Sequence, residues 1–149
     1  MMNSVRTLLL CALAAPVAAQ AQVQPGQWET TSTIHSVEMP GAPPQVAQMM
    51  KGKTTRTRYC VTPEQAAKGP QDMFKQNSSC RFTKFVMKGG TLATEMTCSQ
   101  QGGSMTVRTN GSYTPTSYQA AATMVMSGQM GMRMSSSATG RLLGPCKDR

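Results

Sequence analysis

Methionines at alternating positions are the residues of this chain most able to do distinctive chemistry. The sequence holds 14 methionines in 149 residues. One group occupies only even positions: Met124, Met126, Met130, Met132 and Met134. Successive side chains of a strand point to opposite faces, so this spacing places the whole group on one face of a strand or hairpin. We expect a hairpin turning on residues 127–129, with Met126 opposite Met130 and Met124 opposite Met132.

Two roles fit such a methionine face best, and a sacrificial oxidation surface and an adaptable groove for an apolar ligand are further alternatives. Thioether sulfur is a soft ligand that selects Cu(I), so these methionines are candidate metal ligands. Methionine is also a deformable apolar residue that fills irregular cores, and aromatic residues make up only 5% of this chain. We favour the packing role and keep Cu(I) handling as the alternative function. No other cofactor is expected.

Enzymatic chemistry is poorly represented. His35 is the only histidine, and it lies in a polar row of Ser and Thr that we interpret as solvated. The acidic residues form no close pair suited to general acid–base catalysis; they are Glu29, Glu38, Glu64, Asp72, Glu95 and Asp148. No nucleophile-elbow sequence surrounds any serine. We therefore predict a non-enzymatic protein without catalytic residues.

The N-terminal segment Met1–Ala21 has the layout of a secretory signal peptide, with a basic start, a short apolar stretch and a small-residue exit. Cleavage after Ala21 would leave residues 22–149 as a single periplasmic domain. Lipid attachment at Cys11 is disfavoured because Leu10 stands where a small residue is needed. No other segment approaches the ~20 apolar residues of a transmembrane helix.

Removal of the leader leaves an even set of cysteines for an oxidising compartment, which predicts two disulfides. The set is Cys60, Cys80, Cys98 and Cys146. If a hairpin turns on residues 88–90, Cys80 lies directly opposite Cys98 and Cys60 pairs with Cys146. A change of register by one residue removes that match, so Cys60–Cys80 with Cys98–Cys146 stays open. Zinc is disfavoured because no Cys-x-x-Cys pair exists.

Alternating segments separated by Gly and Pro predict a mainly β fold. The expected strands are 27–37, 54–61, 81–88, 91–98, 104–113, 117–127 and 130–142. We expect an antiparallel meander of about seven strands forming an open barrel or a sandwich. One short helix is predicted after Thr62, with Pro63 at its first position and Gln65 completing a capping box. Residues 39–52, rich in Pro and Gly, are expected to form a mobile loop. Trp28 is expected to anchor the core.

The formal net charge of +9 favours acidic partners. The densest basic group is Lys51, Lys53, Arg56 and Arg58. Only Tyr59 accompanies it, so the stacking platforms of nucleic-acid binders are missing and no nucleic-acid partner is expected. An anionic envelope component or a small apolar ligand is the expected partner.

Several short motifs resemble those of a known family. They are Pro25-Gly26-Gln27-Trp28-Glu29-Thr30, Met39-Pro40-Gly41, Tyr59-Cys60-Val61-Thr62-Pro63-Glu64, the pair Cys80 and Cys98, and Gly140-Arg141-Leu142-Leu143-Gly144-Pro145-Cys146. Together they resemble the DUF3617 family of small secreted proteins of Gram-negative bacteria. The resemblance implies a periplasmic, mainly β domain and supplies no activity. The function expected from the sequence is therefore a non-enzymatic binding or envelope-associated module for a small apolar or anionic envelope ligand.

Overall fold

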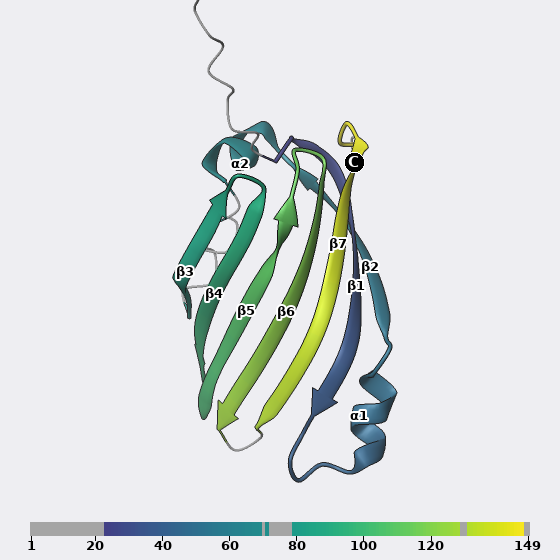
Figure 1. Ribbon diagram of the computed structural model, residues 1–149, viewed down its shortest axis with the longest axis vertical. Coiled ribbons are helices and arrows are strands. Elements are labelled where there is room, and N and C mark those ends of the chain that lie inside the picture. Colours follow the sequence, from purple (N-terminus) through teal and green to yellow (C-terminus); the bar gives the residue numbers. More distant parts are fainter. Residues whose placement is uncertain (1–22, 70, 72–78, 129–130, 148–149) are drawn as a thin grey trace, which may run out of the picture.

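The computed structural model describes residues 23–69, 71, 79–128 and 131–147. Its elements, in chain order, are β1 (Gly26–Glu38), α1 (Pro44–Met50), β2 (Thr54–Val61), α2 (Pro63–Lys68), β3 (Cys80–Lys88), β4 (Thr91–Gln100), β5 (Gly103–Tyr113), β6 (Ser117–Gly128) and β7 (Met132–Gly144). The strands form one seven-stranded antiparallel sheet that twists strongly across its width (Figure 1). The mainly β prediction is confirmed. The sandwich alternative is wrong, because every described strand belongs to the same open sheet.

The order of strands in the sheet is β2-β1-β7-β6-β5-β4-β3. Strands β3 to β7 follow one another as neighbours, which is the expected meander. Strand β1 pairs with both β2 and β7, so the N-terminal hairpin extends the sheet beyond the last strand. The first and last strands of the chain therefore lie side by side, while β2 and β3 form the two edges (Figure 1).

The turn between β3 and β4 differs from the expected one. Lys88 is paired with Thr91, so the loop holds only the two glycines Gly89 and Gly90. Their φ angles of 60° and 78° are in the left-handed region, which glycine adopts without steric cost. The expected three-residue turn on residues 88–90 is wrong, because the observed loop is one residue shorter. Continued without interruption, this register would carry Cys80 past Cys98.

A β-bulge farther from the turn in the same hairpin restores the register that places Cys80 opposite Cys98. The pairing shifts between Phe82 and Lys84, which leaves Thr83 as the additional residue on β3. Below the bulge Cys80 is directly opposite Cys98, and the two form a disulfide. The predicted pairing is thus confirmed, although the register behind it comes from a two-residue turn plus a bulge.

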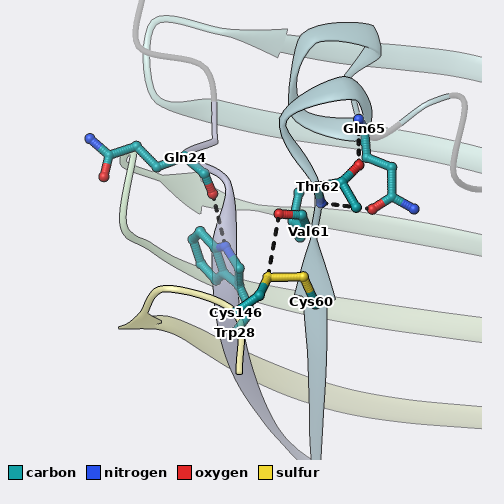
Figure 2. The surroundings of a disulfide bond; sticks show 7 residues. All are labelled: Gln24, Trp28, Cys60, Val61, Thr62, Gln65 and Cys146. Atoms are coloured by element: carbon teal, nitrogen blue, oxygen red, sulfur yellow. Dashed lines mark hydrogen bonds between the residues drawn. A yellow bond between two sulfur atoms is a disulfide. The ribbon is translucent and has the colours of Figure 1, made fainter. Parts of the chain in front are cut away.

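Helix α2 is the predicted helix, and its capping box is present. The Thr62 hydroxyl accepts a hydrogen bond from the Gln65 backbone at 3.2 Å, and the Gln65 side chain accepts one from the Thr62 backbone at 2.9 Å (Figure 2). Pro63 occupies the first turn, where no N–H donor is required. Gly69 ends the helix with a φ of 81°.

Helix α1 was not expected, because it lies within residues 39–52, predicted as an irregular mobile loop. The prolines of this segment precede or open the helix, with Pro43 at the N-cap and Pro44 in the first turn. There they do not interrupt helical hydrogen bonds, and no further proline or glycine occurs before Gly52. The helix lies beside the end of β1 (Figure 1) and buries no residue.

The fully buried core is small and centres on Trp28, which is 1% exposed. Its ring stacks with Tyr118 at 6.2 Å between centroids, and its Nε1 donates to the Gln24 carbonyl at 3.0 Å. The disulfide between Cys60 and Cys146 lies next to Trp28 and joins the end of β2 to the segment after β7 (Figure 2). The expected core role of Trp28 and the second predicted disulfide are both confirmed.

Candidate functional site

The strands alternate so that one side of the sheet carries the large apolar side chains, together with Thr and Ser residues such as Thr94, Thr109 and Ser136. Cross-strand partners share a face, so the register of the pairs assigns each residue to one side. No residue that the described strands place on this side is charged. We call the following residues the apolar face: Phe82, Phe85, Met87, Leu92, Met96, Met105, Val107, Met124, Met126, Met132 and Met134.

The opposite side of the same sheet carries the charges of the strands. We call the following residues the basic face: Arg56, Arg58, Arg81, Lys84, Lys88, Arg108, Arg133 and Arg141. The carboxylates of this side are Glu29, Glu38 and Glu95. The described sheet is therefore amphipathic, with positive charge on one side and apolar side chains on the other.

The predicted methionine hairpin forms, but in a different register. Met126 is opposite Met132, and Met124 is opposite Met134. The expected pairs Met126–Met130 and Met124–Met132 are wrong, because the connecting loop is two residues longer than the expected turn. The even-numbered methionines still share one face, since a shift of two residues preserves the side of the sheet. Met130 lies outside the described residues.

Two methionines that sequence reasoning did not include join this group. Met105 on β5 is directly opposite Met126, and Met96 on β4 lies one strand further across the face. Met132, Met126 and Met105 thus form a row across three strands, with neighbouring Cβ atoms about 4.5–5.5 Å apart. The sequence could have revealed this row if Tyr113 had been paired with Tyr118 across the turn at residues 114–116. Continued along the two strands, that register places Met105 opposite Met126.

The apolar face is only partly buried. The described methionines of the face have intermediate exposure, and the buried hydrophobic residues of the described chain are Trp28, Val61 and Cys98. In the part of the chain that the structure describes, no second sheet packs on this side, so its apolar side chains stay accessible. Such a surface can bind an apolar molecule.

A group of hydroxyls lies on the same side of the sheet, next to Trp28. Thr30 Oγ1 and Tyr118 Oη share a hydrogen bond of 2.5 Å, and Thr30 also donates to Tyr59 Oη at 3.5 Å. Burial raises the pKa of Tyr118 to about 12, so its hydroxyl is neutral at physiological pH. These groups can hydrogen-bond an uncharged polar group of a ligand.

Glu29 is the buried charge of the basic face, with an exposed fraction of 3%. Arg58 Nε donates to its Oε2 at 2.8 Å, and Arg141 Nη2 donates to its Oε1 at 2.9 Å. These hydrogen bonds hold the pKa of Glu29 below its ordinary value, the bond from Arg58 contributing most. Sequence reasoning missed this cluster, since it depends on β1 lying between β2 and β7.

His35 is exposed, as expected. Its Nε2 shares a hydrogen bond of 2.6 Å with Ser137 Oγ. The partner of the imidazole in this bond is therefore a hydroxyl and not a carboxylate. Among the described residues, no group of three or more His, Cys, Asp or Glu side chains could hold a metal ion. Within the same part of the chain, no helix is long and apolar enough to cross a membrane.

Comparison with protein families supplies the identification. Residues 23–146 match the family described as "Protein of unknown function (DUF3617)". The chain belongs to the DUF3617 family. Searches of curated proteins and of solved structures find no significant match.

Three of the motifs that resemble the DUF3617 family meet at one end of the sheet. Trp28 of the first motif is paired with Tyr59 on β2 and with Leu142 on β7. Glu29 of the same motif bonds Arg141 of the last. In this DUF3617 domain the motifs therefore build one end of strands β1 and β7, and the methionines of β6 and β7 lie towards the opposite ends of their strands.

Proposed function

We propose that this domain is a non-enzymatic binding module whose apolar face holds a small, lipid-like ligand. The observation that supports this most directly is the separation of charge between the two sides of the sheet. A side with no charged strand residue can cover an apolar molecule without desolvating ions. Burial of apolar surface contributes about 25 cal/mol for each Å² removed from water.

The residue types of the apolar face favour a flexible ligand such as an acyl chain. Methionine side chains are unbranched and polarizable, so they adapt to ligands of different shape. Met105, Met124 and Met126 are neighbours on β5 and β6, two inner strands of the sheet. The hydroxyls of Thr30 and Tyr118 could bond an ester or hydroxyl group at one end of such a chain.

We place this binding function in the periplasm. The leader-like segment Met1–Ala21 supports export. The disulfides Cys60–Cys146 and Cys80–Cys98 are of the kind that persists in oxidising compartments. Lipids and their precursors are abundant apolar molecules of an envelope, so a ligand of this class would be available there.

The proposal is tested with an uncharged, environment-sensitive naphthylamine probe and two variants of one strand. Met124 and Val125 are neighbours on β6 whose side chains point to opposite sides of the sheet. We expect Met124→Gln to weaken probe binding about tenfold, the loss of roughly 1.4 kcal/mol of apolar contact. The matched control Val125→Gln should leave binding unchanged. Equal losses in both variants would argue against a ligand on the apolar face.

Native mass spectrometry of protein purified from its own compartment gives a second readout. An organic adduct that dissociates in the Met124→Gln variant and not in Val125→Gln would support the proposal. Retention of the same adduct by both variants would place the ligand elsewhere.

Cu(I) handling is the second candidate function, and the methionine row supports it. Met105, Met126 and Met132 are consecutive cross-strand neighbours, so their thioethers can approach one metal ion. Substitution of these residues by leucine removes sulfur and retains apolar surface. Competition with a chromophoric Cu(I) chelator should then show loss of copper binding with probe binding intact. Equal copper retention by wild-type and leucine variants would exclude this function.

A further inference from the structure

We propose that the basic face docks on an anionic phospholipid bilayer, with Arg58 and Arg141 receiving a headgroup phosphate. The inference concerns the side of the sheet opposite the proposed apolar ligand and rests on separate observations. It can therefore fail or succeed independently of the function proposed above.

The first observation is the geometry of the arginine pair. Glu29 lies on β1 between the two arginines, directly opposite Arg58 on β2 and Arg141 on β7. The carboxylate is 3% exposed, whereas the arginine side chains are 62% and 68% exposed. A buried carboxylate thus fixes the inner edges of two guanidinium groups whose remaining parts face solvent.

The second observation is the set of donors that remains. Glu29 receives hydrogen bonds from Nε of Arg58 and from Nε and Nη2 of Arg141. Within the described chain, both Nη atoms of Arg58 and Nη1 of Arg141 engage no other group. Guanidinium donors in a fixed plane match the oxygens of a phosphate and lose little side-chain freedom on binding.

The third observation is the charge around the pair. Two arginines against one carboxylate leave a net positive site, and Arg56 adds a further cation on the same side of β2. Further from the pair, Arg133 on β7 and Lys88 on β3 extend the positive charge across the sheet. The cations of this side outnumber its carboxylates, and a face with net positive charge attracts an anionic membrane surface.

The shape and composition of the face favour a bilayer over nucleic acid or a single phosphate. Six strand spacings of about 4.8 Å place the edge strands roughly 29 Å apart, wide enough to contact several headgroups together. The aromatic residues of the described strands lie on the other side of the sheet, so the basic face has no stacking platform for bases. The arginine pair, half of whose charge is offset by Glu29, binds a single phosphate weakly, whereas many headgroups add avidity.

The test is flotation of the full mature chain with vesicles of defined composition. We expect binding to vesicles containing phosphatidylglycerol and at least tenfold weaker binding to pure phosphatidylcholine. Binding should fall several-fold between 50 and 300 mM NaCl, because surface electrostatics are screened. Inorganic phosphate should compete no more than NaCl of equal ionic strength. Equal binding to both vesicle types, or specific competition by inorganic phosphate, would overturn the proposal.

Variants separate the arginine pair from general charge. Arg58→Lys with Arg141→Lys keeps the charge and removes the planar donors, so we expect about fivefold weaker vesicle binding. Arg108→Lys is the matched control, since Arg108 is 63% exposed and bonds Glu95 on the same side. Equal losses in both would refute a site at the pair. Near-ultraviolet circular dichroism of Trp28 verifies that each variant is folded.

A second comparison keeps the test decisive if the lysine variant does not fold. Arg56→Gln with Arg133→Gln removes two cations from the basic face, and Lys51→Gln with Lys68→Gln removes two from outside the sheet. We expect weaker vesicle binding only in the first. Equal weakening, or binding to a DNA duplex as tight as to anionic vesicles, would contradict docking of this face on a bilayer.

Discussion

The ring of Tyr118 lies directly over Gly140, its partner on the neighbouring strand. A Cβ atom at position 140 would overlap the ring carbons, so only glycine leaves room for the aromatic side chain. In this position the ring stacks on Trp28 and its hydroxyl reaches Thr30. One glycine on β7 therefore permits the packing that buries the tryptophan.

We expect Gly140→Ala to destabilise the domain by about 1–3 kcal/mol, because the added methyl displaces a ring held by stacking and a hydrogen bond. For a domain of this size the melting temperature should fall by roughly 4–10 °C. Gly131→Ala is the control, since the new Cβ would lie 3.9 Å from the Met126 carbonyl oxygen, an ordinary contact, and the φ of Gly131 is not in the left-handed region. Equal shifts in the two variants would argue against the ring contact.

The hydroxyl of Tyr118 should ionise late in an alkaline titration. Burial raises its pKa to about 12, above the ordinary value of ~10 for tyrosine. Because the folded pKa lies above the unfolded one, the neutral hydroxyl stabilises the fold below pH 10, and this contribution is lost as the pH rises through 12. Absorbance at 295 nm should show a phase near pH 12 that Tyr118→Phe removes. Persistence of that phase in the variant would assign it elsewhere.

Glu29 should give the domain a stability that depends on acid pH. Hydrogen bonds from Arg58 and Arg141 lower its pKa in the folded state. Ionised Glu29 therefore stabilises the fold above its ordinary pKa, and this stabilisation is lost as the pH falls through the lowered value. We expect Glu29→Gln to be less stable than wild type in urea at pH 7, with the difference narrowing towards pH 3.

Glu64→Gln provides the comparison for that experiment, because Glu64 lies on helix α2 outside the sheet. It should leave the urea midpoint at pH 7 nearly unchanged. A difference between wild type and Glu29→Gln that stayed constant from pH 7 to pH 3 would show that the arginine contacts do not depend on the charge of Glu29.

The strands could be predicted because each alternates and has a Gly or Pro at its end or within the next two residues, whereas their registers could not. The bulge at Thr83 adds one residue within a run of otherwise regular alternation, and no turn residue marks it. The loop after Met126 is longer than its single central glycine suggested. The observed registers of these two hairpins therefore differ from the expected ones by one or two residues, although the strands lie where they were predicted.

The candidate site was predictable only in part for the same reason. The methionines of one hairpin share a face by parity alone, which the sequence shows. Glu29 contacts Arg58, which is 29 positions away in the chain, and Arg141, which is 112 positions away. These contacts require β1 to pair with both β2 and β7, and no local pattern encodes the pairing with β7. The one-sided distribution of cations likewise emerges only after every strand has a register.

The two disulfides should contribute unequally to stability. Cys60–Cys146 closes a segment of 86 residues, and Cys80–Cys98 closes one of 18. In the chain-entropy treatment, loops of these lengths correspond to about 4.6 and 3.2 kcal/mol of stabilisation, through restriction of the unfolded chain. We expect Cys60→Ala with Cys146→Ala to lower the free energy of unfolding more than Cys80→Ala with Cys98→Ala.

Urea unfolding of the two double variants at pH 7 measures the difference. Cys98 is 1% exposed, so its replacement also leaves a small cavity that adds to the loss from the shorter loop. The long-range disulfide should nevertheless dominate, because it joins the end of β2 to the segment after β7 beside Trp28, the centre of the buried core. A larger loss from the Cys80–Cys98 variant would show that the hairpin, with its bulge at Thr83, depends on the bond for its register.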